Sequence, residues 1–398
     1  MDFSKLSLYL DSFYNEKNIP GVGCAVYHRH KKVYEHYAGF SDVENGVPFG
    51  PSTLFHLYSA TKLITAAAVL QLCEGGRCSL TDPLSAYIPE YRNMKVRSSD
   101  PGGAEIILPA KNPLTIEYLL SMQGGVGSFH VEPVQRVIEE TGGRAPTLAV
   151  VRAAAVEPLL FEPGTRFRYT SCFDVLGGLV EALSGQRFGA YLKEHIFDPL
   201  GMKDTGFTTA EGDRGRLAKD YVQFDAKTNR ARSVGENLGI NLGSEYECGG
   251  GGLYSTVPDY ILFAEALCNG GLGVNGQRIL RKETVQDMGT NRLFGDSAAD
   301  FAAFGGPSKT GYGYGLGVRV LVDREQNNAL SANGEFGWDG ARGCYVLVDP
   351  AGEVAIFYAQ QESGSQWWHW HGTVRNYVYA GLWPLLRTDC PPEQPQSL

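Results

Sequence analysis

Two hairpin-like segments at opposite ends of the sequence constrain the fold of this chain more than any other feature. Residues 22–40 contain two strand-like runs around a polar tip at residues 28–32. Residues 343–359 contain two more such runs around a turn at residues 349–352. We expect both hairpins to share one antiparallel sheet, so that the two ends of the 398-residue chain belong to the same layer.

Helical segments are expected at both chain ends and through the middle of the chain. Residues 3–13 are amphipathic and residues 374–386 have a helical pattern, so each end offers a helix to one face of the sheet. Residues 255–268 begin with hydroxyl residues and a proline that suit a helix start. The middle contains periodic segments between Gly/Pro loops, at residues 115–122, 148–160, 175–183 and 188–197.

These elements predict an α/β fold in which helices flank an antiparallel sheet. We expect residues 1–78 and 244–388 to form a discontinuous α/β sandwich domain, with a mainly helical domain at residues 79–243 inserted into it. Residues 389–398 contain three prolines and are predicted to be disordered.

Charge and apolar patterning exclude several classes of partner. The net charge of −9 argues against binding to nucleic acid or to an anionic membrane. No run reaches the ~20 apolar residues of a membrane span, and the first residues lack the pattern of a signal peptide, so we expect a cytoplasmic protein. The eight cysteines contain no C-x-x-C pair and are expected to be reduced and mostly buried. Cys73 and Cys78 are close enough to suggest a disulfide, but the expected helix-to-turn location and compartment argue against one.

Ser59-Ala60-Thr61-Lys62 places a hydroxyl and an amine one helical turn apart. The apolar stretch at residues 63–73 predicts a buried helix after it, so Ser59 could be a nucleophile with Lys62 as its base. About one Ser-x-x-Lys is expected by chance in a chain of this composition, so the surrounding sequence has to decide.

Further motifs follow in a fixed order along the chain. They are Pro20-Gly21-Val22, residues 52–62, Leu80-Thr81-Asp82-Pro83, Phe161-Glu162-Pro163-Gly164, Tyr169, Pro199-Leu200-Gly201-Met202, residues 251–256, Tyr314-Gly315-Leu316-Gly317 and Trp338-Asp339-Gly340. In these motifs the chain resembles the serine β-lactamase-like hydrolases, which include class C β-lactamases, D-alanyl-D-alanine carboxypeptidases and β-lactamase-fold carboxylesterases and transesterases. The resemblance covers residues of roughly 15 to 385. It implies a sheet flanked by helices, a helical domain, and an active site between them.

The resemblance implies a role for Tyr169. The family's second motif, Tyr-x-Asn, is carried onto Tyr169-Thr170-Ser171. Tyr169 would assist Lys62 in moving the proton from Ser59 to the leaving group. Ser171 replaces the asparagine that offers an amide to the substrate, so that contact would be weakened or lost.

The family's third motif is Lys-Thr-Gly, and two positions compete for it. Lys309-Thr310-Gly311 has those letters, but it precedes a segment similar to the family's preceding strand. We interpret it as coincidental and expect Lys309→Ala to leave activity nearly intact. Trp338-Asp339-Gly340 stands at the matching place and is similar to the Trp-Gly-Gly variant of the esterase branch. Gly340 lets substrate approach the strand edge, and the backbone N–H groups of Ala341 and Ser59 would form the oxyanion hole.

This variant motif bears on the substrate. Trp338 brings an apolar face and Asp339 a negative charge, so anionic acyl donors are expected to bind poorly. Arg342 could restore a cation or pair with Asp339. The expected activity is therefore hydrolysis of neutral or apolar carboxylic esters through an acyl-enzyme at Ser59, with Lys62 largely neutral so that it can accept a proton.

Alternatives stay open at this point. They are a β-lactamase or D-amino-acid peptidase, transfer of the acyl group to an alcohol or amine, and a non-catalytic binding module. A small-molecule ester or amide is the expected partner, no cofactor or metal is expected, and the oligomeric state is not predicted. His369-Trp370-His371 lacks acidic or cysteine partners for a metal. The tryptophans Trp367, Trp368 and Trp370 could line an acyl pocket or pack under the last helix.

Overall fold

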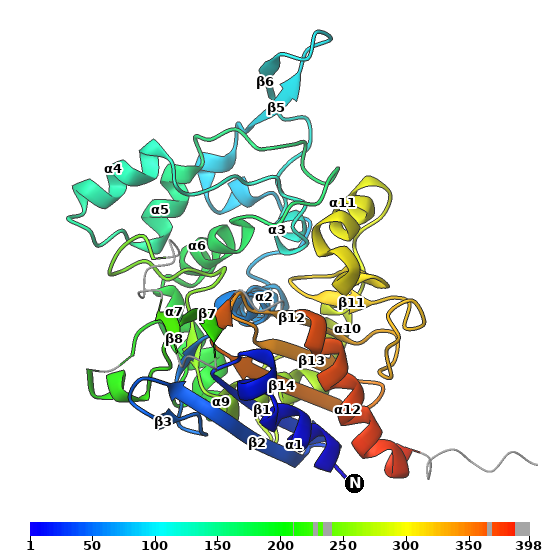
Figure 1. The fold of residues 1–398 in the computed structure, drawn as a ribbon. Helices are drawn as coiled ribbons and strands as arrows, with labels where there is room; N and C mark the ends of the chain where they lie inside the picture. Colours follow the sequence, from blue (N-terminus) through cyan, green and yellow to red (C-terminus); the bar gives the residue numbers. More distant parts are fainter. Residues whose placement is uncertain (210, 226–229, 234–240, 364–367, 387–398) are drawn as a thin grey trace, which may run out of the picture.

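An eight-stranded antiparallel sheet forms the lower half of the molecule (Figure 1). The computed structural model describes residues 1–209, 211–225, 230–233, 241–363 and 368–386; the predicted disordered segment 389–398 lies outside them. The strand order is β10-β11-β12-β13-β14-β1-β2-β3. These strands are β1 (Gly21–His28), β2 (Lys31–Asp42), β3 (Val47–Pro48), β10 (Tyr312–Tyr314), β11 (Arg319–Leu321), β12 (Phe336–Asp339), β13 (Tyr345–Asp349) and β14 (Val354–Gln360).

The two terminal hairpins meet at the centre of this sheet. Strand β1 pairs antiparallel with β14, with Val22 opposite Gln360 and His28 opposite Val354. Both strands are buried along almost their whole length, because helices cover both faces of the sheet at this point. The prediction that the two hairpins share one sheet is confirmed.

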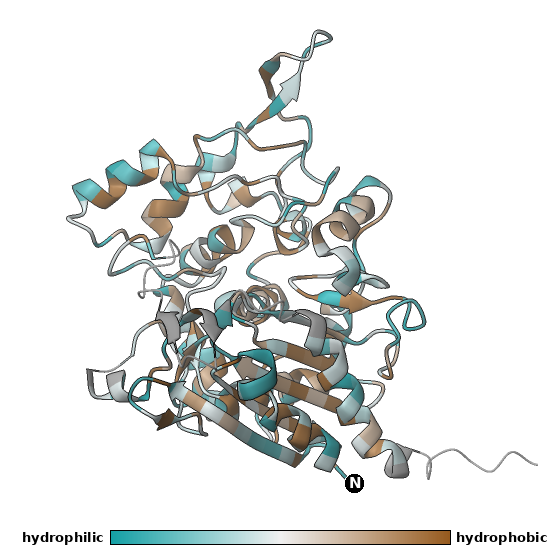
Figure 2. Cartoon of the chain, in the orientation of Figure 1, coloured by the Kyte–Doolittle hydropathy of each residue, from teal (hydrophilic) through white to brown (hydrophobic). Residues whose placement is uncertain are grey.

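The terminal helices α1 (Ser4–Asp11) and α12 (Trp368–Leu386) pack together over one face of the sheet. Leu6 and Leu10 of α1 and Val374 and Val378 of α12 are fully buried in a shared apolar cluster with β1, β13 and β14. Figure 2 shows hydrophobic residues concentrated along these strands. The expectation that both chain ends contribute a helix to one face is therefore correct.

Helix α9 (Val257–Cys268) packs on the opposite face, against β1, β13 and β14. The side chain of Thr256 accepts a hydrogen bond from the Asp259 N–H and so caps α9 where the sequence predicted a helix start. Helix α2 (Thr61–Glu74) runs through the middle of the molecule, and nearly all of its residues are buried (Figure 1). The start of α2 therefore lies between the sheet and the helices above it.

Further helices lie mainly above α2 in Figure 1 or along the side of the molecule. They are α3 (Ile116–Leu120), α4 (Glu132–Glu140), α5 (Thr147–Ala154), α6 (Cys172–Ser184), α7 (Phe188–Leu192), α8 (Asp198–Leu200), α10 (Lys282–Met288) and α11 (Asp296–Gly305). Shorter helical turns are η1 (Phe13–Lys17), η2 (Tyr58–Ala60), η3 (Leu84–Ala86), η4 (Pro89–Tyr91), η5 (Lys193–Phe197), η6 (Glu211–Arg216) and η7 (Gly306–Lys309).

The expected helix at residues 148–160 is too long. Helix α5 ends at Ala154, and the backbone N–H of Leu159 instead donates to the carbonyl of Lys95 at 2.7 Å. Pro158 explains the difference, because the residue before a proline disfavours helical geometry and the proline itself has no N–H.

Short strands outside the main sheet were not predicted by the sequence pattern. These short strands are β4 (Phe55–His56), β5 (Lys95–Ser99), β6 (Glu105–Pro109), β7 (Tyr221–Asp225), β8 (Arg230–Ser233), β9 (Tyr254–Ser255) and β15 (Glu362–Ser363). The hairpin of β5 and β6 projects from the top of the molecule (Figure 1). Strand β15 pairs parallel with β7, which connects the middle of the chain to the segment after β14.

The structure bears on the expectations about membrane spans and cysteines. No described helix is both long enough and apolar enough to cross a membrane. The seven described cysteines are free thiols; the thiols of Cys73 and Cys78 are hydrogen-bonded at 3.4 Å and form no disulfide.

Candidate active site

Ser59 and Lys62 lie side by side at the start of α2. Ser59 belongs to the short turn η2, and Lys62 lies in the first turn of the helix, where it is only 4% exposed. The Lys62 ammonium donates to the Ser59 hydroxyl at 3.2 Å and to the carbonyl of Gly250 at 2.5 Å. The glycine-rich loop before β9 therefore holds the amine against the hydroxyl, a role that the sequence pattern did not reveal.

Tyr58, the residue before Ser59, has a left-handed backbone with φ of 47°. A tyrosine is rarely found in this region, so its surroundings have to hold it there. Its hydroxyl donates to the carboxylate of Asp220, and the Arg342 guanidinium lies 3.6 Å from the same carboxylate and 5.5 Å from the Tyr58 ring centre. Burial raises the pKa of Asp220, while Tyr58 and Arg342 oppose that shift. The arginine thus pairs with Asp220, not with Asp339.

Tyr169 lies in a stack of three aromatic rings. Its ring is 5.1 Å from that of Phe304 and 5.4 Å from that of Trp338, both nearly parallel to it. The indole N–H of Trp338 donates to the Tyr169 hydroxyl at 2.9 Å, and the Lys62 ammonium is 4.6 Å from the Tyr169 ring centre. The three residues that the sequence predicts as catalytic, Ser59, Lys62 and Tyr169, are therefore brought together.

The end of β12 lies directly against the nucleophile segment. A side chain at Gly340 would place its first carbon 2.5 Å from the carbonyl oxygen of Leu57, so this contact requires glycine. The backbone N–H of Gly340 donates to the carbonyl of Cys344 at 2.8 Å, which turns the chain after β12. As a result Ala341 and Ser59 face the same cavity.

A cluster of buried charges lies behind this strand end. Asp339 is paired with Lys309, lies 3.2 Å from Arg319, and is 3.5 Å from the ring of His371. Burial opposes ionisation of Asp339, yet the charges of Lys309 and Arg319 hold the pKa of its carboxyl well below the usual range. Burial also lowers the pKa of Lys309, against the effect of Asp339.

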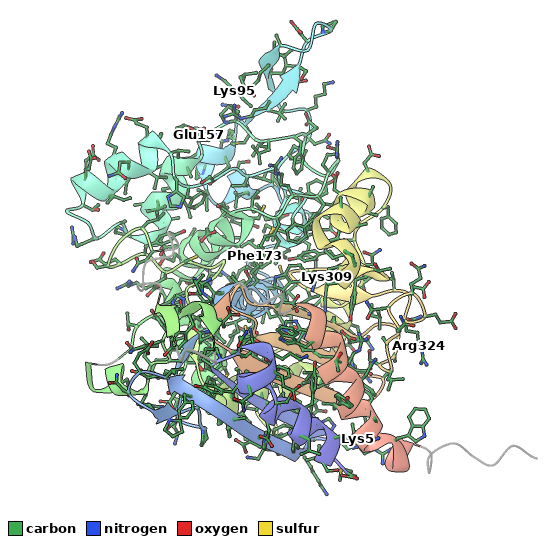
Figure 3. The ribbon with its side chains drawn as sticks, in the orientation of Figure 1. Lys5, Lys95, Glu157, Phe173, Lys309 and Arg324 are labelled. Atoms are coloured by element: carbon green, nitrogen blue, oxygen red, sulfur yellow. The ribbon has the colours of Figure 1, made fainter. Side chains whose placement is uncertain are left out.

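The position of Lys309 corrects the sequence interpretation. The sequence interpretation treats Lys309-Thr310-Gly311 as coincidental, yet Lys309 lines the same cavity as Ser59, because η7 lies over the end of β12. Figure 3 labels Lys309 in the centre of the molecule, between α11 and β12. The expectation that Lys309→Ala leaves activity nearly intact therefore no longer follows.

These residues surround a cavity of about 510 Å³. Ser59 and Tyr169 line it together with residues 303–309 and residues 338–341. Apart from Ser59, Ser308, Lys309 and Asp339, the side chains are aromatic, aliphatic or absent. A cavity that combines a few polar groups with apolar walls is typical of a site for a small organic molecule.

Several predicted site residues lie elsewhere. Ser171 and Arg342 are not among the residues that line the cavity. Trp370 packs against Phe13 in the cluster formed with the terminal helices. Of the two roles that the sequence left open for Trp370, the structure therefore supports packing under the last helix. Trp367 and the side chain of Trp368 lie outside the described part of the chain.

His371 packs behind the charged end of β12. Its Nε2–H donates to the Gly343 carbonyl at 2.9 Å, and its Nδ1 lies 3.5 Å from the Asp339 carboxylate. The side chain of His369 lies outside the described part of the chain. Within the described ranges, no group of three or more His, Cys, Asp or Glu side chains could hold a metal ion.

The fold agrees with comparison to known proteins. Residues 7–367 match the protein-family model described as Beta-lactamase, so the chain belongs to the β-lactamase family and is an enzyme of the serine-hydrolase type. Protein Rv1367c of Mycobacterium tuberculosis is 31% identical over 349 residues, covering 86% of each chain. Esterase EstB of Burkholderia gladioli is 28% identical and covers 88% of this chain and 89% of its own.

Solved structures support the same fold. Unliganded simvastatin synthase LovD from Aspergillus terreus has a TM-score of 0.78 at 22% identity, covering 96% of this chain and 98% of its own. EstCE1, a hydrolase with promiscuous acyltransferase activity, has a TM-score of 0.75 at 23% identity, covering 95% and 98%. At these identities the likeness concerns the fold.

Proposed function

We propose that this enzyme hydrolyses carboxylic esters with neutral or apolar groups through an acyl-enzyme at Ser59. The observation that carries the proposal is the contact of Lys62 with Ser59 at the edge of a cavity with mainly apolar walls. The name of the relative EstB, and that of a lovastatin esterase of Penicillium rubens that is 29% identical over 288 residues, support ester substrates.

The proposed reaction begins with attack of the Ser59 oxygen on the ester carbonyl carbon. The Lys62 amine takes the hydroxyl proton, and Tyr169 passes a proton to the departing alcohol oxygen. The carbonyl oxygen becomes negatively charged and is stabilised by the backbone N–H groups of Ser59 and Ala341, a contribution of about 3 kcal/mol per donor. Water then attacks the acyl carbon and gives a proton to the Tyr169 oxygen. As the acid leaves, Lys62 returns its proton to the Ser59 oxygen, which regenerates all three groups.

The aromatic stack fits Tyr169 for this role. The Trp338 indole donates to the Tyr169 hydroxyl at 2.9 Å, which fixes the position of the oxygen. The same indole occupies the place where a Lys-Thr-Gly motif would offer a cation and a hydroxyl to a carboxylate. This difference favours ester over β-lactam or peptide substrates.

Acyl transfer is the second candidate. An acyltransferase of Penicillium decumbens, calJ, is 26% identical and covers 83% of this chain. The acyl-enzyme chemistry is the same in both reactions, and only the final acceptor differs, water or an alcohol. The cytoplasmic location expected from the sequence stays a prediction.

A panel of p-nitrophenyl esters from acetate to decanoate, with nitrocefin beside it, tests the proposal. We expect turnover of the esters, little turnover of nitrocefin, and a loss of at least about a thousandfold in kcat for Ser59→Ala. Ser99→Ala, an exposed serine on β5, is the matched control and should behave as the unmodified enzyme. Ester turnover that survives Ser59→Ala would contradict the mechanism, and fast nitrocefin turnover with slow ester turnover would favour a β-lactamase.

Two further measurements separate the remaining alternatives. Intact-mass analysis after treatment with a fluorophosphonate should show one adduct that Ser59→Ala abolishes. A protein without turnover and without an adduct would be a binding module. Addition of butanol, with detection of the butyl ester, distinguishes acyl transfer from hydrolysis.

A further inference from the structure

Lys309 places a buried ammonium group among apolar cavity walls. Its side chain is 11% exposed, and its nitrogen lies 5.7 Å from the ring centre of Trp338, which also lines the cavity. Phe304 and Pro307 line the same wall. A lysine in such a place has few ways to satisfy its donors other than water or a bound molecule.

The ammonium retains donor capacity beyond its ion pair. A lysine has three N–H donors, and among the described residues Asp339 is the hydrogen-bond partner of Lys309. Asp339 is itself shared with Arg319 and His371. A substrate that displaces water from this wall therefore leaves donors of Lys309 unsatisfied unless it carries an acceptor.

The charged side chains around Lys309 form a continuous chain of ion pairs. Lys309 pairs with Asp339, Asp339 also pairs with Arg319, and Glu335 pairs with Arg319 and Arg375. Burial lowers the pKa of His371, so this ring is neutral near neutral pH. An added carboxylate would have to lose its water and lie beside Asp339, the carboxylate that is already paired with Lys309 and lines the same cavity, which is costly. An uncharged oxygen acceptor avoids that cost.

We propose that Lys309 forms a subsite for an uncharged oxygen acceptor on the substrate, such as a ketone or a second ester carbonyl. This subsite rests on the proposed ester hydrolysis, because it defines which esters fit the cavity. Lys309 is then a specificity-determining residue: it favours esters with a second oxygen function some bonds from the scissile carbonyl over apolar esters of the same shape.

Binding to the Ser59→Ala variant tests the subsite without turnover. Titration calorimetry compares p-nitrophenyl 4-oxopentanoate with p-nitrophenyl pentanoate, and 3-acetylphenyl acetate with 3-ethylphenyl acetate. We expect the oxygenated ester of at least one pair to bind about tenfold tighter, as for a hydrogen bond to a charged donor. The pair that shows this preference tells whether the acyl or the alcohol side reaches Lys309.

Substitutions of Lys309 in the same background complete the test. The ratio of the two Kd values should fall to near one in Lys309→Met and should be largely kept in Lys309→Arg. Lys95→Met, an exposed lysine on the projecting hairpin, is the matched control (Figure 3). A ratio near one while Lys309 is intact would overturn the proposal, and that measurement does not depend on any Lys309 variant folding. A ratio unchanged in Lys309→Met would also overturn it.

The charge of the preferred group is tested with p-nitrophenyl hydrogen succinate. We expect this anion to bind more weakly than the 4-oxopentanoate ester. Tighter binding of the anion that disappears in Lys309→Met would overturn the assignment to an uncharged group. All Kd values come from the Ser59→Ala variant, so they do not depend on turnover. A clear preference for the oxygenated esters, together with no ester turnover by the unmodified enzyme, would therefore contradict the proposed hydrolysis but not the proposed subsite.

Discussion

Asp220 connects the two backbone segments that carry the predicted oxyanion donors. It accepts a hydrogen bond from Tyr58, which precedes Ser59, and it pairs with Arg342, which follows Ala341. The left-handed conformation of Tyr58 costs roughly 1 kcal/mol or more and is retained because the hydroxyl is fixed at the other end of the side chain. One carboxylate thereby sets the positions of both N–H groups.

Asp220→Asn should lower kcat about tenfold and change KM less than about threefold, because misplaced oxyanion donors affect the transition state more than the bound ester. The amide can still accept from Tyr58 but no longer balances the charge of Arg342. Steady-state kinetics with p-nitrophenyl butyrate provides the measurement, with thermal unfolding as a check on stability. Asp213→Asn, a carboxylate paired with Arg216 on the preceding turn, is the control. A rise in KM at constant kcat would show that Asp220 acts on binding instead.

Among single residues, the sequence predicts those contacts that lie within one short motif. Ser59 in η2 and Lys62 in the first turn of α2 are only three positions apart, so their contact is local and predictable. Asp220 and Lys309 join the site through ion pairs with residues far away in sequence, and a carboxylate or ammonium carries no local sign of its partner. Arg342 illustrates this limit. Its closeness in sequence to Asp339 suggested an ion pair between them, whereas in the structure Arg342 pairs with Asp220.

Helix α11 and the turn η7 form one wall of the cavity. Asp300 anchors the helix through the Arg166 guanidinium at 2.6 Å and the backbone N–H of Phe167 at 3.1 Å, close to Tyr169 in sequence. Phe304 at the end of the helix is 51% exposed and still stacks on Tyr169. This wall therefore limits the size of the cavity and also holds the ring of Tyr169 in place.

Phe304→Ala should widen the range of accepted acyl chains. Removing the ring opens the cavity, so kcat/KM for decanoate relative to butyrate should rise about tenfold, within the range known for changes of pocket size. Loss of the ring contact should also lower kcat for butyrate, because an aromatic pair contributes about 1 kcal/mol. The p-nitrophenyl chain-length series measures both effects. Phe294→Ala, 75% exposed before α11, is the control, and an unchanged chain-length profile would contradict the role of Phe304.

Among the elements, several with a clear apolar pattern were predicted, whereas the helices α4, α10 and α11 and the short polar strands were not. The terminal hairpins and the helices α6 and α9 follow from apolar patterns. The hairpin of β5 and β6 had a turn signal at residues 100–103, Asp-Pro-Gly-Gly, between short runs of mixed polarity. Strand β7 depends on pairing with β15 across the molecule, which no local pattern encodes.

The molecule as a whole has one large apolar core that crosses the predicted domain boundary. A single cluster contains Ile64 of α2, Leu176 of α6 and Phe357 of β14, all fully buried. Phe173 of α6 and Ala66 of α2 both lie next to Gly317, in the turn between β10 and β11. The boundaries at residues 78 and 244 remain a prediction, but shared packing of this kind couples the stability of the helical segment to that of the sheet.

Leu176→Ala and Phe357→Ala should therefore lower the same unfolding transition. Each substitution removes fully buried side-chain volume and should cost about 3 kcal/mol. For a chain of this length that corresponds to a fall in Tm of about 4 °C. Scanning calorimetry and far-ultraviolet circular dichroism should give one coincident transition in the unmodified protein and in both variants. Leu8→Ala, 70% exposed on α1, should shift Tm by less than about 1 °C, as surface substitutions do. Two separate transitions, with Leu176→Ala moving one and Phe357→Ala the other, would instead mean that the helical segment unfolds as an independent domain despite the shared core.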